Sequence, residues 1–180
     1  VLGEIQNTAV AGTKEDALLR YRLDNLGNVL ETTVLWTKGM DVPVLGTTVS
    51  TLPSTEHMIS LNARGDYMTV VFGLGVVAVM INSDLKLAQQ GDPSPVPGLT
   101  WANLNQSKLA LNDRGGFVYS GALVTDPTYL IVKGSMDDIG NQQKFAQAGD
   151  VLPAFSTVGL GNGSAAPIYI ANNGDIFWRA

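Results

Sequence analysis

The sequence predicts an all-β protein built from repeated antiparallel hairpins. Only 15% of the 180 residues are charged, well below the usual share for a globular chain, and 20 are glycine. Apolar residues alternate with polar ones on either side of a glycine turn that occurs four times. The stretch from Lys14 to Arg22 could form one short helical turn, but Ala17 to Arg22 fits a strand equally well. The predicted architecture is β-propeller-like, and an irregular β-sandwich or barrel is the alternative.

The hairpin motif is a seven-residue segment with an aliphatic residue four positions before a glycine and an apolar residue two positions after it. The four copies are 23–29, 61–67, 111–117 and 170–176, with turn glycines Gly27, Gly65, Gly115 and Gly174. Because strand side chains alternate between faces, residues four and six before the glycine should share the buried face. The residues expected to face the core are Leu23, Ile59, Leu61, Leu109, Leu111, Ile168 and Ile170.

The turn residues have defined roles. Asp24, Asn62 or Asn112 at the first turn position can cap the turn through its side chain. A glycine at the fourth position supplies the positive φ of a type I turn followed by a bulge. In the last copy Ala171 replaces the capping residue, so a tighter two-residue turn at Asn173-Gly174 is an alternative there.

A second motif places proline four residues after a glycine, and it follows a predicted strand in each case. Its glycines are Gly39, Gly91 and Gly149. Proline cannot donate to a strand ladder, so the motif predicts a strand end and a turn. The nearby carboxylates Asp41, Asp92 and Asp150 are expected to cap these turns, with Ca²⁺ ligation as the alternative.

The two motifs interleave along the chain. Turn glycines of the first motif are separated by roughly 40 to 60 residues, which is close to the length of a propeller blade. Residues 1–180 are therefore interpreted as a single β-repeat domain with about four hairpin units. That domain is either complete or a fragment of a longer repeat array.

These residues resemble a family of bacterial secreted tandem-repeat proteins, whose signature is Asn-x-x-Gly followed by an aromatic residue. The matching positions are Asn62-x-x-Gly65, Asn112-x-x-Gly115 with Tyr119, and Gly174 with Phe177 and Trp178. The Gly-Asp turns at Gly91 and Gly149 alternate with these hairpins, as in that family. The resemblance implies propeller-like repeats and an extracellular or cell-surface location, often with an anchoring tail.

Composition argues against several functions. The net charge of −5 and pI of about 4.6 disfavour nucleic acid as a partner. The longest apolar stretch, 68–81, is too short to span a membrane. With no cysteine and one histidine, His57, no cofactor or metal is expected. The adjacent acids Asp137 and Asp138 are weak metal candidates and are better explained as a solvated loop.

Candidate binding residues lie around one tryptophan. Trp101 follows a proline-rich turn, with Asn103 and Asn105 close behind it. An exposed tryptophan there would stack on a sugar or contact a partner. The alternative is that Trp101 fills the core between two sheets.

The sequence therefore predicts a non-catalytic, secreted or cell-surface repeat protein that acts in adhesion or assembly. Its partners would be other protein chains or further repeats of the same kind. The first alternative is a lectin-like module that binds glycans through Trp101. The second is a propeller-type glycan hydrolase or lyase, which would need two positioned carboxylates.

Overall fold

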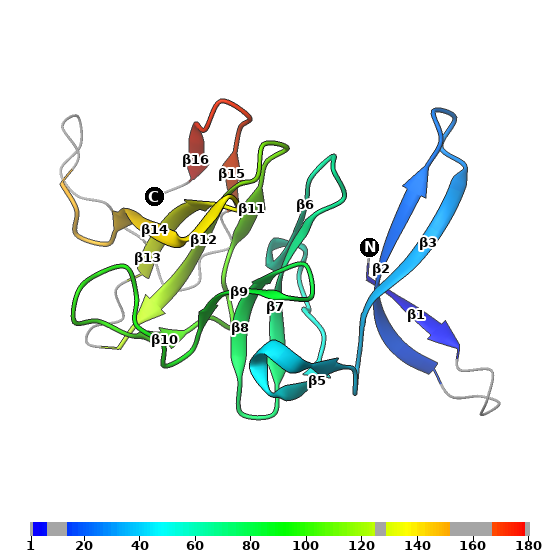
Figure 1. The fold of residues 1–180 in the computed structure, drawn as a ribbon, viewed down its shortest axis with the longest axis horizontal. Helices are drawn as coiled ribbons and strands as arrows, with labels where there is room; N and C mark the ends of the chain where they lie inside the picture. The colour runs from blue at the N-terminus through cyan, green and yellow to red at the C-terminus, as the bar shows by residue number, and fades with distance from the viewer. Residues whose placement is uncertain (1, 7–13, 125–128, 152–166, 179–180) are drawn as a thin grey trace.

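The computed structural model describes residues 2–6, 14–124, 129–151 and 167–178 (Figure 1). Within these ranges every strand pairing is antiparallel and the sheets are curled, which confirms the all-β prediction. The helical segments in the same ranges are two short 3-10 turns. They are η1 (Pro43–Leu45) and η2 (Glu56–Met58).

The first sheet has three strands in the order β1-β2-β3, with bounds β1 (Leu2–Gln6), β2 (Lys14–Leu23) and β3 (Val29–Thr37). The segment that begins at Lys14 is therefore a strand and not a helical turn. The Gly27 turn joins β2 to β3.

The second and third sheets are larger. The second contains β4 (Asp41–Val42), β5 (Thr47–Thr51), β6 (Ile59–Leu61), β7 (Tyr67–Gly73), β8 (Val77–Ile81) and β9 (Leu85–Gln89). The third contains β10 (Trp101–Asn103), β11 (Leu109–Leu111), β12 (Gly116–Leu123), β13 (Tyr129–Ser135) and β14 (Asp138–Gln147). A final hairpin consists of β15 (Ile168–Ile170) and β16 (Ile176–Trp178).

The second and third sheets repeat one arrangement, which we call the four-strand unit. Its first strand is split in two, as β5 and β6 or as β10 and β11, and both parts pair with the long second strand, β7 or β12. The third and fourth strands are β8 and β9, or β13 and β14. The same bulge interrupts the pairing of third with fourth strand, between Val79 and Met80 in one unit and between Ile131 and Val132 in the other.

The first sheet supplies only part of such a unit. Its β2–β3 pair has that bulge between Leu18 and Leu19, and β3 leads into the Gly39 turn just as β9 leads into Gly91. Strands β2 and β3 are therefore third and fourth strands. The Gly65 and Gly115 turns join first to second strands. The Gly27 turn instead joins a third strand to a fourth, so its hairpin matches the others in its turn but differs from them in its position in the unit.

The turn glycines adopt the conformation that the turn interpretation requires. Gly27, Gly39, Gly65, Gly91, Gly115, Gly149 and Gly174 all have φ between 83° and 92°. In the last hairpin the Gly174 amide donates to the Ala171 carbonyl, and the Ala171 amide donates to Asp175. This pattern matches the other three hairpins, so the two-residue alternative at Asn173-Gly174 is wrong.

Two of these glycines form a matched pair for substitution. A Cβ at Gly27 would meet nothing within 4 Å, whereas one at Gly115 would lie 2.8 Å from Arg64 Nη2 and 3.4 Å from Met136 Cβ. Gly27→Ala is expected to cost about 1 kcal/mol of unfolding free energy, from the positive φ alone. Gly115→Ala should cost somewhat more, because the Arg64 guanidinium must also move away from the added methyl group. Chemical denaturation of both variants measures the difference, and equal losses would mean that the Arg64 side chain moves without cost.

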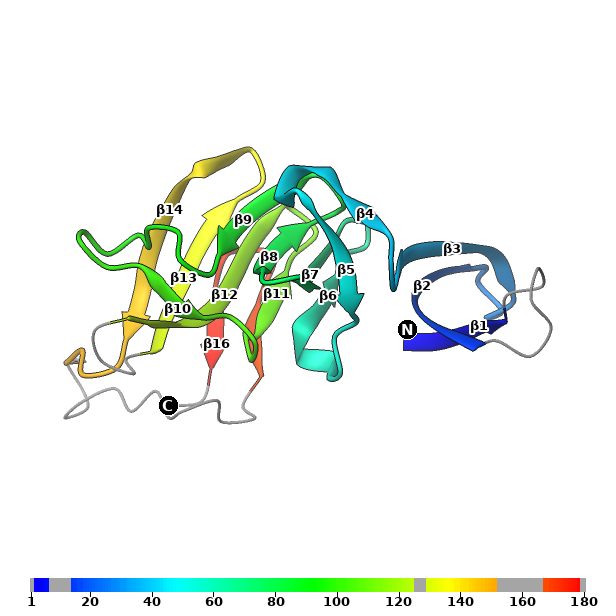
Figure 2. The ribbon, with the colours of Figure 1, turned by 90° about the horizontal axis from the view of Figure 1, so that it is seen from below.

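The sheets are stacked face to face, and each interface has its own core (Figure 2). The interface between the second and third sheets is the largest and includes Met68, Val70, Phe117 and Tyr119. Separate clusters lie between the first and second sheets and between the third sheet and the last hairpin. Strands of the middle sheets are therefore buried on both faces. This explains the nearly continuous apolar run over 68–81, which forms β7 and β8.

Two residues expected in the core are exposed. Leu109, Leu111 and Ile168 are buried, but Leu23 and Leu61 are each 53% exposed. Leu111 is covered because neighbouring hairpins stack on both sides of β11. Leu23 and Leu61 instead line an open apolar groove between the first sheet and the β6–β7 hairpin. The prediction for these two residues was wrong. Strand alternation predicts which side chains share a face, but not whether a neighbouring hairpin covers that face.

The turns of three hairpins are joined by an asparagine ladder, defined by Asn62, Asn112 and the turns that they contact. Asn112 Oδ1 accepts from the amides of Arg114 and Gly116, which caps its own turn. Its Nδ2 donates to the Ala171 carbonyl of the next hairpin, at 2.9 Å. Asn62 caps its turn in the same way, and its Nδ2 donates to the Asn112 carbonyl at 3.2 Å. The ladder fixes the stacking of consecutive hairpins.

Candidate functional site

The structure places Trp101 inside the protein. Its side chain is 1% exposed and belongs to the core between the second and third sheets, with its ring centroid 5.6 Å from that of Tyr119. The indole is therefore not free to stack on a sugar, and the core alternative describes its role. Asn103 and Asn105 are exposed, and the Asn105 amide donates to Asn103 Oδ1. The three residues do not form one site.

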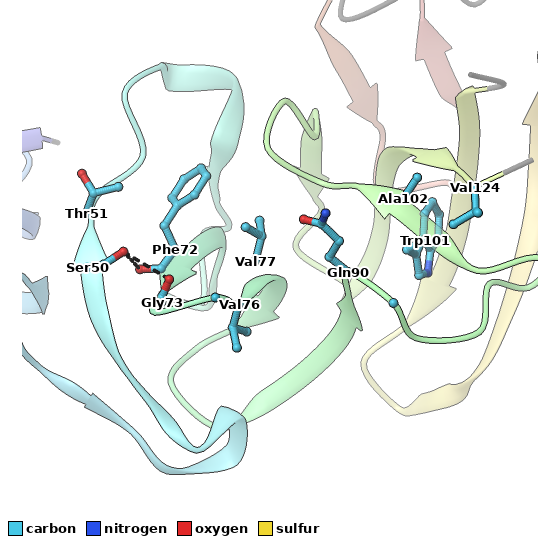
Figure 3. A pocket seen from close by; sticks show the side chains of 12 residues that line it. Ser50, Thr51, Phe72, Gly73, Val76, Val77, Gln90, Trp101, Ala102 and Val124 are labelled. Atoms are coloured by element: carbon cyan, nitrogen blue, oxygen red, sulfur yellow. Dashed lines mark hydrogen bonds between the residues drawn. The ribbon is translucent and has the colours of Figure 1, made fainter. Parts of the chain in front are cut away.

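A depression lies beside Trp101 where the turn between β7 and β8 approaches the Gly91 turn (Figure 3). One wall comes from the second sheet and includes Thr51 and Phe72. The other includes Gln90, Ala102 and Val124. None of the lining residues carries an ionisable side chain. The site could contact a neutral ligand, but it offers no acid, base or charged nucleophile.

The hydroxyl of Ser50 in this depression is already engaged. It lies 2.9 Å from the Phe72 carbonyl oxygen and 3.3 Å from that of Gly73, to which it donates (Figure 3). Ser50 therefore stabilises the pairing of β5 with β7. Thr51 and Gln90, which are both exposed, remain the polar groups that a ligand could reach.

A second depression lies between the third sheet and the last hairpin. Two cationic side chains, Arg114 and Lys133, line it together with the amide side chains of Asn112, Asn141, Gln143, Asn172 and Asn173. Its lining contains no carboxylate. It therefore lacks the carboxylate pair that hydrolysis of a glycosidic bond requires.

A partly buried chain of polar groups connects two sheets, and no motif in the sequence predicts it. The Tyr119 hydroxyl donates to Gln142 Oε1 at 2.6 Å, and Gln142 Nε2 donates to the Leu87 carbonyl at 2.9 Å. Burial raises the pKa of Tyr119. The phenol therefore stays neutral and acts as a structural donor, because its proton is held by an acceptor inside the core.

Two of the three acidic turn candidates, Asp92 and Asp150, form local contacts. Asp92 and Asp150 form ion pairs with Lys86 and Lys144, at 2.9 and 2.7 Å. Asp150 also accepts from the Gln147 amide, as a turn cap does. Each pair joins a fourth strand, β9 or β14, to the turn that follows it.

Asp137 and Asp138 are exposed. In the portion of the chain that the structure describes, no group of three or more His, Cys, Asp or Glu side chains could hold a metal ion. His57 lies in η2 beside Glu56, at 3.9 Å. The nearby Ser60 hydroxyl accepts from the Leu111 amide at 2.9 Å, so it serves hairpin stacking.

Asp113 is an acid whose carboxylate contacts the turns of two neighbouring hairpins. Its carboxylate accepts from the Ala63 amide and from Asn172 Nδ2, which belong to the hairpins on either side. The Asn172 hydrogen bond and the Ala63 amide, with a smaller contribution from the Arg64 charge, hold the pKa of Asp113 below its usual 3.8 against the opposing effect of desolvation. The charged form therefore links three turns.

Acid should weaken this link. Because folding lowers the pKa of Asp113, its contribution to stability is complete above the unfolded value of 3.8 and is lost as pH falls through the folded value. The melting temperature of the wild type should therefore fall more steeply below that pH than that of Asp113→Asn, which cannot titrate. If the melting temperatures of the two proteins fell equally steeply below pH 3.8, the lowered pKa of Asp113 would be contradicted.

Within the described ranges, no helix has the length and hydropathy needed to cross a lipid bilayer. Comparison with known proteins gives no relative: no family model, no curated protein and no solved structure matches the chain.

Proposed function

We propose that the chain is a non-catalytic repeat scaffold that acts in adhesion or assembly, outside the cell or on its surface. The observation that supports this proposal is the use of polar side chains at the turns. The side chains of Asn62, Asn112 and Asp113 each form a hydrogen bond with the next hairpin. A chain whose buried polar groups join its units is suited to presenting an extended, rigid surface.

A propeller-like arrangement of the units is part of this proposal. The four-strand unit occurs twice, with the same strand order and the same bulge, and the units meet face to face. The turns that join β2 to β3, β6 to β7, β11 to β12 and β15 to β16 all point to one side of the molecule (upward in Figure 1). Repetition of this kind around an axis is how propellers leave only short edges exposed.

The catalytic alternative has less support. Neither depression beside the third sheet has a carboxylate in its lining. Glycosidases place two carboxylates on either side of the scissile bond. A lyase or hydrolase would need its acid and base elsewhere on the chain.

Adhesion can be tested directly. Beads coated with the folded chain are expected to be retained on a layer of bacterial cells, and excess soluble chain should compete. Beads coated with a soluble β-protein of similar pI are the control for charge. Retention no better than the control would contradict adhesion, and release of reducing sugar from a panel of polysaccharides would contradict a non-catalytic role.

Neutral glycan binding is a second candidate, because the uncharged depression in Figure 3 combines Phe72 with the hydroxyl of Thr51 and the amide of Gln90. An aromatic face with flanking amide and hydroxyl groups is suited to a sugar ring. On a glycan array, any signal should disappear in Gln90→Ala and persist in Leu74→Ala, which alters an exposed residue of the adjacent turn. Loss in both variants would indicate an effect on folding.

A further inference from the structure

Strand β3 is an edge strand with little protection against pairing with another chain. The sheet order β1-β2-β3 places it at an edge of the first sheet, and among the residues that the structure describes it pairs with β2 alone (Figure 1). Its nine residues include five β-branched side chains, one charge, and no glycine or proline. A long edge strand of this composition presents unpaired N–H and C=O groups to any strand that can align with them.

The corresponding edges of the other two units are protected by lysine. Strands β9 and β14 are also fourth strands at an edge of their sheets. Lys86 and Lys144 occupy the first paired position beyond the bulge, where β3 has Val34. Lysine is common on the edge strands of natural sheets, because an ammonium group resists burial beneath an added strand. Strand β3 lacks this protection.

The ion-pair partner of the lysine is replaced in the first unit as well. Each lysine pairs with the aspartate that follows the next turn glycine, Asp92 or Asp150, at 2.9 and 2.7 Å. In the first unit the residue in that place, after Gly39, is Met40. Val34 and Met40 are 45% and 38% exposed. An ion pair in two units therefore corresponds to two exposed apolar side chains in the first.

The position of Val34 reaches solvent even where another sheet packs on the same face. Lys86 lies opposite Met80, in the core between the first and second sheets, and its side chain is still 33% exposed. Lys144 lies opposite Val132, in the core between the second and third sheets, and is 40% exposed. Strand β9 likewise remains at an edge although its sheet lies between two others (Figure 2). Further repeats beside the first sheet would therefore leave the β3 edge accessible.

We propose that β3 pairs antiparallel with β3 of a second copy of the chain, in a register centred on Thr32. This inference rests on the proposed role in assembly and names the partner. Val34 of each copy then lies opposite Leu30 of the other, so aliphatic side chains face each other across the new pair. The contact is the same from both sides and uses the one edge that each copy offers, so it closes at two copies.

The single charge of β3 selects this register among its neighbours. Centring the pair on Glu31 would place two carboxylates opposite each other, which is destabilising. Centring it on Thr33 would place each Glu31 opposite the apolar Leu35. In the register centred on Thr32, Glu31 lies opposite Thr33, and it keeps its ion pair with Arg22 of its own copy, at 3.4 Å.

Charges at the ends of the strand are complementary in the same register. Lys38, just after β3, is exposed. Antiparallel pairing about Thr32 brings it to the Gly27 turn of the second copy, which carries the carboxylate of Asp24. The same contact occurs at both ends of the pair. Opposite charges at these two places favour this partner and this direction of pairing.

Light scattering on the 180-residue chain tests the association. A dimer of about 38 kDa is expected, twice the 19.0 kDa chain. The double variant Val34→Lys with Met40→Asp, which introduces the ion pair of the other units, should be a monomer with a cooperative melt. Leu74→Lys is the control, because Leu74 is 75% exposed in a turn of the second sheet, and it should remain a dimer. A wild type that is monomeric at every concentration, larger assemblies, or a dimeric double variant would overturn the pairing.

Cysteine cross-linking tests the register, because the chain has no cysteine of its own. Thr32→Cys lies opposite itself and should give a disulfide-linked dimer on oxidation. Val34→Cys is the control on the same strand, because its two copies would lie about 14 Å apart along the strands. That separation is too long for a disulfide. A mixture of Val34→Cys with Leu30→Cys should cross-link again, and equal cross-linking of Thr32→Cys and Val34→Cys alone would overturn the register.

Retention of coated beads is measured separately from the mass in solution. A monomeric chain that is retained would overturn the β3 pairing and leave adhesion standing. A dimeric chain that is not retained would overturn adhesion and leave the pairing standing.

Discussion

Replacing Trp101 by alanine is expected to lower the free energy of unfolding by about 3–5 kcal/mol, the usual cost of truncating a large buried aromatic side chain. Trp101 fills the space between the second and third sheets, beside Leu104 and Tyr119. The fit is close: a Cβ added at Gly121 would lie only 2.7 Å from the Trp101 ring and 2.6 Å from Leu104. Surrounding side chains can therefore fill little of the cavity that the substitution leaves.

Urea denaturation followed by far-ultraviolet circular dichroism measures this loss. Leu74→Ala is the control, because Leu74 is 75% exposed in the turn between β7 and β8 and should change stability by less than about 0.5 kcal/mol. Trp101→Phe should lie between the two. If Trp101→Ala were as stable as the control, the core between these sheets would be wrongly placed and a surface role for the indole would return.

The turns are the part of the fold that the sequence predicts best. An acceptor at the first turn position and a glycine at the fourth determine a backbone conformation through contacts within five residues. Gly65 and Gly115 adopt it, with φ of 88° and 83°. The hydrogen bonds of the Asn62 and Asn112 caps follow the same local rule. Nothing distant is needed to specify them.

The position of a turn within a sheet is not encoded in the same residues. The turn at Gly27 has the cap and hydrogen bonds of the others, with Asp24 Oδ1 accepting from Leu26 and Asn28, yet it joins third and fourth strands. Third and fourth strands are identified by a bulge in their pairing. A bulge depends on the partner strand as well, so the turn residues alone do not predict it. For the same reason Leu61 and Leu111 look equivalent in sequence but differ in burial. Only Leu111 has a hairpin stacked on both sides.

The burial of the middle sheets on both faces also explains why the sequence did not predict the surroundings of Trp101. When a sheet is covered on both sides, its strands lose the polar alternation that marks an exposed face, so the apolar run over 68–81 did not reveal which residues face which neighbour. Trp101 is similar, because its strand has only three residues and follows a proline-rich turn typical of a surface loop. The contact with Tyr119 that buries it comes from a different part of the chain.

One signal for the asparagine ladder was present in the sequence. Asp and Asn cap a turn equally well, since either provides the acceptor oxygen. Only Asn also carries a donor. Along the chain the first turn positions are Asp24, Asn62, Asn112 and Ala171, and the amide occurs at the two turns whose Nδ2 reaches a following hairpin. Asn instead of Asp at the first turn position thus indicates that the turn contacts the next hairpin.

The substitution Asn112→Asp isolates that contact. A carboxylate would still accept from the amides of Arg114 and Gly116, but it would place a negative oxygen against the Ala171 carbonyl where Nδ2 now donates. Because the charged oxygen would face the Ala171 carbonyl oxygen across a partly buried contact, the variant is expected to lose about 1–3 kcal/mol at neutral pH. Asn112→Ala, which also loses both caps, should lose more. Asp24→Asn is the control, because Asp24 is at a turn with no such contact and both residues cap.

The pH dependence of Asn112→Asp gives the sharper test of the ladder. Burial and the opposing carbonyl should raise the pKa of the new carboxyl above its unfolded value. A group with a raised folded pKa stabilises the fold when protonated, and that contribution is lost as pH rises through the folded value. The deficit of the variant relative to the wild type should therefore shrink as pH falls, because the protonated carboxyl can donate to the Ala171 carbonyl. Melting temperatures measured for both proteins across the acid range would show the two curves converging. A deficit that stays constant with pH would contradict the raised pKa, and the absence of a deficit at any pH would mean that the Nδ2 contact contributes nothing to stability.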